Sequence, residues 1–321
     1  MSNPLISILI PAYNVDKYIY QCLESVCRQS YRNLQIVVID DGSKDSTLSI
    51  LSRFAEKDNR IEVITRENRG VARTRNELLD RAKGEFVLFV DSDDWIEPEM
   101  ISTLVRLKEE YSVDLVMCRK IYNNTDCLDE NCTINVWDKE EILDRFMRHR
   151  ELTGSLWNKL IKRSLFDRIR FQPDISYGED AMVIWDILNK VDKMVYTTKA
   201  YYHHRMNEYS ISYQGLSEPK MSVITVWEYI CSKAGASDRT LGDKALARFG
   251  GEISLLMFEY FRGESTYEGE KRVIILIKKL KELYRFMIKD ENISYKLKVF
   301  AGLCILNQPF LKFLSKRLKA F

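Results

Sequence analysis

The residues best suited to chemistry are three acids that directly follow an apolar run. Phe86 to Val90 are five apolar residues, and Asp91, Asp93 and Asp94 come next, with Ser92 between the first two. Such a run is typical of a strand buried on both faces, so the acids must lie where the strand leaves the sheet. Close carboxylates repel one another unless a cation lies between them, and oxygen ligands suit Mg²⁺ or Mn²⁺. The pattern predicts a divalent-metal site; the alternative is a solvated acidic turn before the next helix.

Two other apolar runs also end in polar turns. The first run ends at Pro11 to Asn14, and the second, Leu34 to Ile39, ends at Asp40 and Asp41. In open α/β sheets, ligands bind at the edge where the carboxyl ends of the strands meet. Turn formation by itself favours Gly or Asn rather than facing acids. The three turns therefore predict one binding site at that edge.

The elements that must position these turns alternate between strand and helix. This order predicts an α/β fold with a mostly parallel, Rossmann-like sheet and helices on both faces. The expected strands are Leu5–Ile10, Leu34–Ile39, Ile61–Ile64, Glu85–Val90 and Asp114–Cys118. The expected helices are Asp16–Ser30, Asp45–Glu56, Val71–Ala82 and Glu97–Glu110, with Lys83-Gly84 as the C-cap of the third.

The second half of the chain has a different pattern. Helices are expected at Lys139–Arg148, Ser164–Arg168 and Ala181–Lys190, and a short strand at Lys193–Thr197. From about Pro219 the pattern is helical to the end. We therefore expect a catalytic domain over residues 1–215 and a helical C-terminal region over residues 216–321.

Composition limits the class of protein. The chain has 321 residues, 45% hydrophobic and 30% charged, with a formal net charge of +2, which does not favour nucleic acid as a partner. The seven cysteines form no CxxC pair, and Cys118, Cys127 and Cys132 are spaced unlike a zinc ribbon. These features favour a reducing cytoplasm, and the first residues do not resemble a signal peptide.

Six segments occur in an order that resembles one known family, the family 2 glycosyltransferases of the GT-A fold. They are Pro11-Ala12-Tyr13-Asn14, Asp40-Asp41-Gly42-Ser43, Asn68-Arg69-Gly70 to Arg75-Asn76, Asp91-Ser92-Asp93-Asp94, Trp157-Asn158-Lys159-Leu160 and Gly178-Glu179-Asp180. The resemblance covers residues 5–212. It implies an inverting, metal-dependent transfer from a UDP-sugar to a glycan or lipid-linked acceptor. It also implies a place in bacterial capsule, exopolysaccharide or cell-wall synthesis, with a hexosyl or N-acetylhexosaminyl group transferred.

The resemblance also implies roles for particular residues. Asp40 matches the acid that hydrogen-bonds uracil, and Asp93 matches the main ligand of a Mn²⁺ or Mg²⁺ ion that bridges the diphosphate. Asp91 lies near the ribose and shares the metal. The other residues implied to contact the donor are Pro11, Ala12, Tyr13, Asn68, Gly70, Arg75, Ser92 and Arg205.

Asp180 matches the general base of the family, which takes the proton of the acceptor hydroxyl. Glu179 is expected to hold the sugar or to orient a neighbour. Acids are also favoured at a helix N-terminus for structural reasons, and both readings can hold at once.

Several positions keep two interpretations open. His203 or His204 could complete the metal shell, or could pack or cap the end of a strand. Trp157 could stack on a sugar or lie in the core. Lys159 and Arg73 could reach the diphosphate, with a solvated helix position as the alternative for Arg73.

The chain ends in a basic, apolar segment. Residues 294–321 contain six basic residues and no acid, alternating with apolar clusters. This composition favours a helix on an anionic membrane surface, so the enzyme is expected in the cytoplasm, peripheral to the inner face of the plasma membrane. The alternatives are a helix packed on the C-terminal region and, for function, a non-catalytic GT-A partner subunit. A homo-oligomer is compatible with either function.

Overall fold

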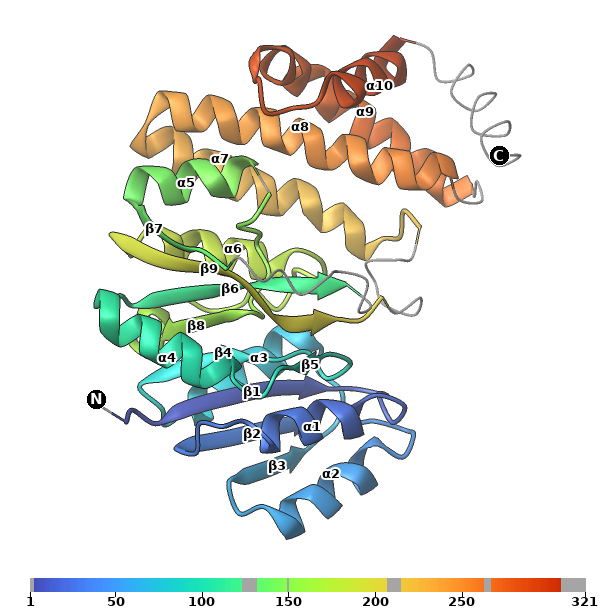
Figure 1. The fold of residues 1–321 in the computed structure, drawn as a ribbon. Coiled ribbons are helices and arrows are strands. Elements are labelled where there is room, and N and C mark those ends of the chain that lie inside the picture. Colours follow the sequence, from blue (N-terminus) through green and yellow to red (C-terminus); the bar gives the residue numbers. More distant parts are fainter. Residues whose placement is uncertain (1–2, 123–131, 149, 207–214, 263–266, 307–321) are drawn as a thin grey trace. The chain divides into compact units, whose positions relative to one another are not determined.

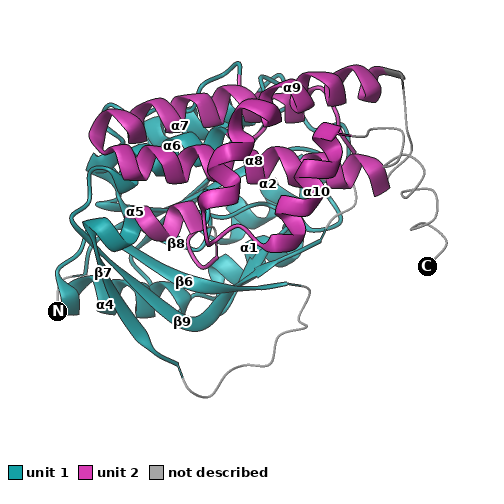
Figure 2. Ribbon diagram, turned by 90° about the horizontal axis from the view of Figure 1, so that it is seen from above, with its two compact units in different colours: residues 1–142, 153–174, 179–207 teal, residues 143–152, 175–178, 208–321 magenta. Residues whose placement is uncertain are grey.

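A computed structural model of the chain describes residues 3–122, 132–148, 150–206, 215–262 and 267–306. Two compact units, coloured separately in Figure 2, make up the structure. Unit 1 comprises residues 1–142, 153–174 and 179–207, and unit 2 comprises residues 143–152, 175–178 and 208–321. The boundary that the sequence predicts near residue 215, between a catalytic domain and a helical region, stays a prediction.

Unit 1 is built on one mixed sheet of nine strands, shown in Figure 1. Its order is β3-β2-β1-β4-β8-β6-β9-β5, and β7 pairs with β9. The strands are β1 (Ile6–Ala12), β2 (Leu34–Asp40), β3 (Ile61–Thr65), β4 (Phe86–Phe89), β5 (Trp95–Ile96), β6 (Leu115–Tyr122), β7 (Ile134–Asp138), β8 (Lys159–Lys162) and β9 (Lys193–His204).

The predicted strand–helix alternation is confirmed in the first half of the chain. β1 to β4 are parallel, and Ala12 pairs with Asp40 across the end of β1 and β2. The helices of this unit are α1 (Ile19–Cys27), α2 (Thr47–Lys57), α3 (Val71–Arg81), α4 (Met100–Tyr111) and α6 (Glu179–Leu188). The first four residues of α5 (Lys139–Arg148) also belong to unit 1, and the rest of α5 belongs to unit 2. A 3₁₀ turn, Arg163–Phe166, stands where the sequence predicts a helix over Ser164–Arg168.

Both faces of the central strands are buried, which explains their continuous apolar runs. Ile6, Ile8 and Ile10 of β1 pack in one cluster with the apolar stripes of α1 and α4. Leu9, on the opposite face of β1, is also fully buried, and α3 packs against β1 and β2. The buried sheet leaves only its edges for polar side chains, which fixes where a site can form.

Gly84 has a different role from the predicted helix cap. α3 ends at Arg81, and Gly84 follows two residues after the cap residue Ala82. A Cβ on Gly84 would lie 2.6 Å from the Ser7 amide nitrogen and 2.7 Å from the Leu5 carbonyl oxygen. Glycine is therefore needed because the chain passes directly against β1 as it enters β4.

The second half of the sheet differs from the sequence expectation. β9 runs for 12 residues instead of the predicted five, and β5, β7 and β8 were not predicted as strands. β8 is antiparallel to both β4 and β6, while β6 and β9 are parallel. Short strands of this kind lack a clear period-2 pattern, so the tertiary pairing decides their structure.

Unit 2 is helical, as predicted for the end of the chain. Its helices are α7 (Val223–Ser237), α8 (Arg239–Arg262), α9 (Tyr267–Lys289) and α10 (Tyr295–Leu306), preceded by a 3₁₀ turn at Pro219–Ser222. Among the described residues, no helix combines the length and the apolar character needed to cross a bilayer.

Candidate active site

The loops after β1 and β2 interlock at the carboxyl edge of the sheet. The amide of Asn14 donates to the Ser43 hydroxyl at 2.9 Å, and the amide of Lys44 donates to the Asn14 side-chain oxygen at 2.8 Å. Asn14 adopts φ 50°, which Asn tolerates better than most residues. In the same loop Ala12 is buried, Pro11 is half-buried and Tyr13 is 48% exposed. Tyr13 thus offers an aromatic face at the predicted nucleoside wall.

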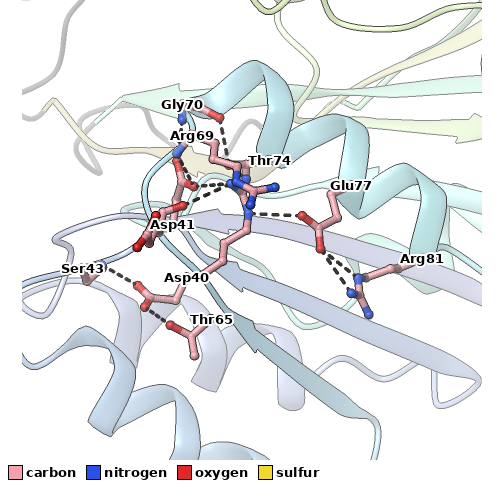
Figure 3. Close-up of polar contacts among 11 residues, drawn as sticks. Asp40, Asp41, Ser43, Thr65, Arg69, Gly70, Thr74, Glu77 and Arg81 are labelled. Carbon is pink, nitrogen blue, oxygen red and sulfur yellow. Dashed lines mark hydrogen bonds and ion pairs between the residues drawn. The ribbon is translucent and has the colours of Figure 1, made fainter.

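Asp40 and Asp41 are both buried and both bonded to the protein, as Figure 3 shows. Asp40 accepts from the Thr65 hydroxyl at 2.9 Å and from the Ser43 amide at 3.2 Å. Asp41 accepts from the amides of Arg69 and Gly70 at 3.0 and 2.9 Å. Asp40 is 1% exposed, so its predicted bond to uracil, which stays a prediction, requires a change in its surroundings.

The turn from Asn68 to Gly70 is shaped by Asp41. Arg66 pairs with the Asp41 carboxylate at 3.0 Å, and Asn68 and Gly70 are exposed. A Cβ on Gly42 would lie 2.8 Å from the Asn68 amide nitrogen, and Gly42 has φ 80°. Only glycine lets the second and third loops approach this closely.

The three carboxyl groups of the acidic turn after β4 differ in how deeply they are buried. Asp94 is 1% exposed and accepts from the Tyr202 hydroxyl at 2.8 Å and from the Arg205 amide at 2.8 Å. Asp91 and Asp93 are half-buried, and Ser92 is buried. Asp91 and Asp93 are therefore partly accessible, as a metal site requires, whereas Asp94 is buried and hydrogen-bonded to the protein.

The electrostatics of Asp91 fit a cation. The pKa of its carboxyl is raised to about 7, because burial and the nearby Asp94 and Asp93 together outweigh the opposing effect of Arg75. An acid cluster with too little neighbouring positive charge suits a hard divalent ion. Among the described residues, no three His, Cys, Asp or Glu side chains form a metal-binding group by themselves. The two carboxylates fit a metal that draws its remaining ligands from a diphosphate or water.

Arg75 connects the acidic turn to the start of α6. Its guanidinium forms an ion pair with Glu179 and lies 3.6 Å from the Asp91 carboxylate. The Nε–H of Arg75 is buried and has no hydrogen-bond partner among the described residues. Burial by itself would lower the pKa of the guanidinium, but Glu179, Asp91 and Asp180 raise it. The predicted donor contact of Arg75 must therefore be made from a position between two acids.

Asp180, the predicted base, lies in the first turn of α6. It is half-buried, and its Oδ1 accepts from the Ala181 amide at 2.9 Å. Burial raises the pKa of its carboxyl to about 6, with a further contribution from Glu179. A carboxyl with this pKa is ionised at neutral pH yet remains a competent proton acceptor. Glu179 is buried against Arg75, consistent with an orienting function.

Arg205 is held by several protein groups. Its Nε donates to the Asp93 carbonyl at 2.8 Å and one Nη donates to the Gln21 side chain at 2.6 Å. The guanidinium also lies 4.7 Å from the Trp95 ring centre and 5.0 Å from that of Tyr18. Arg205 is next to the acidic turn, and its predicted diphosphate contact stays a prediction.

For Trp157 and His203, the contacts in the structure favour packing within the protein over contact with a ligand. Trp157 is 8% exposed and stacks between Tyr202 and His204, with ring centres 4.9 and 5.1 Å away. His203 stacks on Trp95 and bonds to Glu97, so it is a packed residue. His204 contacts Asp94 at 3.2 Å, which places it near the acidic turn but against the anchored acid.

The ammonium of Lys159 is hydrogen-bonded within the protein. Lys159 is fully buried, and its ammonium donates to the Ser155 carbonyl at 2.7 Å and to the Asn158 side chain at 3.1 Å. Burial lowers the pKa of Lys159 to about 7. Arg73, by contrast, is exposed on α3, which agrees with the interpretation of Arg73 as a solvated helix residue.

Two residues near the site were missed by the sequence reasoning. Tyr202 bridges the acidic turn with its hydroxyl, and Asp41 organises the third loop. The signal for Tyr202 was present in the polar aromatic cluster at residues 201–204, but its partner is over 100 positions away. Asp41 belongs to the segment Asp40-Asp41-Gly42-Ser43, but the neighbouring residues do not show that its function differs from that of Asp40.

Comparison of the amino-acid sequence with known proteins identifies the same family as the resemblance of the six segments. The family profile described as "Glycosyl transferase family 2" matches residues 7–170. The chain is 34% identical over 219 residues to "Glycosyltransferase GlyA" of Streptococcus pneumoniae, covering 64% of this chain and 31% of that protein. It is 32% identical over 219 residues to "Putative glycosyltransferase EpsH" of Bacillus subtilis, covering 66% and 63%. The match therefore spans less than two thirds of either relative.

Comparison with solved structures confirms the predicted fold. TarS 1-349 of S. aureus, in complex with UDP, matches with a TM-score of 0.73 at 22% identity, covering 97% of this chain and 91% of that one. Mannosyltransferase PcManGT from Pyrobaculum calidifontis, in complex with GDP-Man and Mn²⁺, matches with a TM-score of 0.52 at 14% identity, covering 100% and 88%. At these identities the likeness establishes a GT-A-like fold and nothing further.

The Asp41 network predicts a measurable stability effect. In Asp41→Asn an amide replaces one carboxylate oxygen, so one backbone N–H loses its acceptor and Arg66 loses an ion pair. We expect the free energy of unfolding to fall by about 1–3 kcal/mol in urea titrations. Asp114→Asn is the matched control, because Asp114 makes an exposed pair with Lys162 at 3.0 Å and should cost at most about 1 kcal/mol. Equal losses in the two variants would contradict the role given to Asp41.

Proposed function

Since this chain belongs to glycosyl transferase family 2, we propose that it transfers a sugar, with inversion, from a UDP-sugar to a glycan or lipid-linked acceptor. The proposed process is bacterial surface-polysaccharide or cell-wall glycan synthesis. The observation that carries the proposal is the Arg75 bridge, in which one terminal nitrogen contacts Asp91 of the acidic turn and the other contacts Glu179, next to Asp180. A metal side and a base side thus lie within one site of unit 1.

The donor side is assigned to the loops after β1, β2 and β4. Tyr13, Asn68 and Gly70 are exposed there, where a nucleoside can contact them. The structures of S. aureus TarS in complex with UDP and with UDP-GlcNAc support a UDP-sugar as the donor class for this chain. The buried Nε–H of Arg75 adds a donor suited to an anionic group of the bound nucleotide.

Asp93 and Asp91 are the proposed ligands of a divalent ion, Mn²⁺ or Mg²⁺. When bound, such an ion supplies positive charge to the diphosphate that leaves the sugar. The raised pKa of Asp91 supports the proposal, because added positive charge would stabilise its carboxylate. The Mn²⁺ in the PcManGT structure supports the metal class in the same way.

Asp180 is the proposed general base. Its carboxylate accepts the proton of the acceptor hydroxyl while that oxygen bonds to the anomeric carbon. The bond from this carbon to the diphosphate oxygen breaks on the opposite side, and its electron pair leaves with UDP. Attack from the side opposite the leaving group inverts the anomeric centre. Glu179, paired with Arg75, orients this arrangement without taking up the proton.

The end of the chain is proposed to contact an anionic membrane surface on the cytoplasmic side. Ala301 and Cys304 of α10 are buried, so the packed alternative holds for part of the segment. Tyr295 and Leu306 of the same helix are exposed by 80% and 84%. Residues 307–321 lie outside the described residues, and their sequence adds four basic residues and no acid. Apolar and basic groups together suit the surface of an anionic bilayer.

Asp93→Asn should reduce sugar transfer to background, because an amide is a weaker ligand for Mn²⁺ than a carboxylate. The measurement is UDP release from a panel of nucleotide sugars with Mn²⁺, together with calorimetric UDP affinity with and without the ion. Asp80→Asn is the control, since Asp80 is 62% exposed on α3 and pairs with Arg170. Unchanged turnover in Asp93→Asn would remove Asp93 from the metal site. Absence of transfer by the wild type over the whole panel would favour the non-catalytic partner subunit.

The pKa of Asp180, about 6, predicts the acid limb of the pH profile. The base functions only when it is ionised, so kcat/KM should fall about tenfold per pH unit below pH 6 and level off above it. Asp180→Asn should bind the nucleotide sugar like the wild type and lose transfer at every pH. A variant that keeps the wild-type rate would place the base at another residue.

Removing residues 307–321 should release the protein from membranes. The deletion leaves α10 in place and removes four positive charges. We expect weaker sedimentation with vesicles that contain phosphatidylglycerol, and less dependence on ionic strength. A full-length variant with Lys312, Lys316, Arg317 and Lys319 changed to Gln separates the charge from the apolar contribution. Sedimentation that does not change after the deletion would favour a helix packed on unit 2.

A further inference from the structure

The acidic turn is closed by Asp94 and attached to the distant strand β9. The amide of Asp94 donates to the Asp91 carbonyl at 3.0 Å, which makes residues 91–94 a tight turn. Its carboxylate accepts from Tyr202 and His204 at the end of β9 and from the amide of Arg205, the residue that follows β9. All of these bonds lie within unit 1. Asp94 is thereby buried and bonded to the protein, whereas Asp91 and Asp93 are half-buried.

Tyr202 is the residue that contacts both ends of this turn. Its hydroxyl accepts from the Asp91 amide at 3.0 Å and donates to the Asp94 carboxylate at 2.8 Å. The side chain is fully buried and stacks on Trp157, so the hydroxyl has little freedom to move. A hydroxyl has one donor and can accept at the same time, so both capacities are directed at the turn.

The sheet joins the turn to β9 on its C-terminal side, through β5, but not through β4. β4 and β9 are separated in the strand order by β8 and β6, so no ladder bond joins β4 to the end of β9. The register of β6 against β9 shifts between Cys118 and Lys120. Trp95, directly after the turn, pairs with His203 across β5 and β9. On the β4 side, the turn is therefore joined to β9 by the bonds of Tyr202 to Asp91 and Asp94.

We propose that Tyr202 is a positioning residue for the divalent ion: its hydroxyl, bonded to both the Asp91 amide and the Asp94 carboxylate, aims the carboxylates of Asp91 and Asp93 at the same ligand. This inference rests on the proposed metal dependence. Tyr202 does not touch the ion or the nucleotide. It acts by fixing the backbone that carries the two ligands, since small displacements of ligands weaken a metal site.

Tyr201 provides a matched comparison. It precedes Tyr202 on β9 and is 3% exposed, and its hydroxyl hydrogen-bonds to the Thr103 hydroxyl of α4 at 3.0 Å. Because side chains alternate across a strand, the two tyrosines point to opposite sides. Tyr201→Phe and Tyr202→Phe each remove one buried hydroxyl, so Tyr201→Phe controls for the loss of a buried hydroxyl at this end of β9. Only Tyr202→Phe removes a bond to the acidic turn.

The experiment measures binding of UDP by calorimetry over a range of Mn²⁺ concentrations, without turnover. For Tyr202→Phe we expect about a three- to tenfold rise in the Mn²⁺ concentration that gives half-maximal UDP binding, the size of effect that one hydrogen bond can give. Affinity for UDP in metal-free buffer should equal that of the wild type. Tyr201→Phe should show the wild-type Mn²⁺ dependence. Thermal unfolding of all proteins identifies any general loss of structure.

Asp94→Asn is a second variant that loses a different partner of the same turn. Its amide group would face the Arg205 amide or His204 in place of an acceptor oxygen, so we expect a similar rise in the Mn²⁺ requirement. An unchanged requirement in both Tyr202→Phe and Asp94→Asn, or an equal rise in Tyr201→Phe, would overturn the inference. If UDP binding by the wild-type protein does not depend on Mn²⁺, both the proposed metal site and this inference are wrong. The two failures are therefore distinguishable.

Discussion

The structure of the site depends on how carboxyl groups are held at the edge of a sheet that is buried on both faces. Burial disfavours the ionised form, and neighbouring acids add to that cost. Arg75 offsets part of it by lying between Asp91 and Glu179. The same ion pair joins a turn at the end of β4 to the start of α6, so one guanidinium both lowers the electrostatic cost and determines the geometry. The remaining excess of negative charge is what makes the edge suitable for a cation.

The acids of the candidate site fall into two groups according to what their oxygens contact. Asp40, Asp41 and Asp94 are buried and accept hydrogen bonds from backbone amides and side chains, so they shape the loops. Asp91 and Asp180 are half-buried with raised pKa values, so they remain available to ligands. Buried acids with satisfied hydrogen bonds make the loops rigid, and this rigidity lets the accessible acids keep a defined position. The division follows from contacts rather than from residue type.

β9 has more influence on the site than its sequence suggested. The sequence predicts a short strand of five residues, whereas β9 has 12 and contacts the acidic turn through Tyr202 and His204, and Arg205 follows it directly. A strand of this length becomes possible because β6, β7 and β5 all pair with it. His203 and Trp157, which were candidates for ligand contact, are used in stacking that supports this end of the strand.

The sequence by itself determined the α/β class, the order of the first four strands and helices, and the edge where the polar loops lie. These features follow from local patterns, namely continuous apolar runs, helical periodicity and the acids that end each run. Only the tertiary structure decided which acid is buried, which partner each one bonds and that Arg75 lies between two of them. Tyr202 and Asp94 are separated by over 100 residues, and Arg75 and Glu179 are as well. No local pattern encodes such pairs, because they exist only after the sheet has brought distant parts of the chain together.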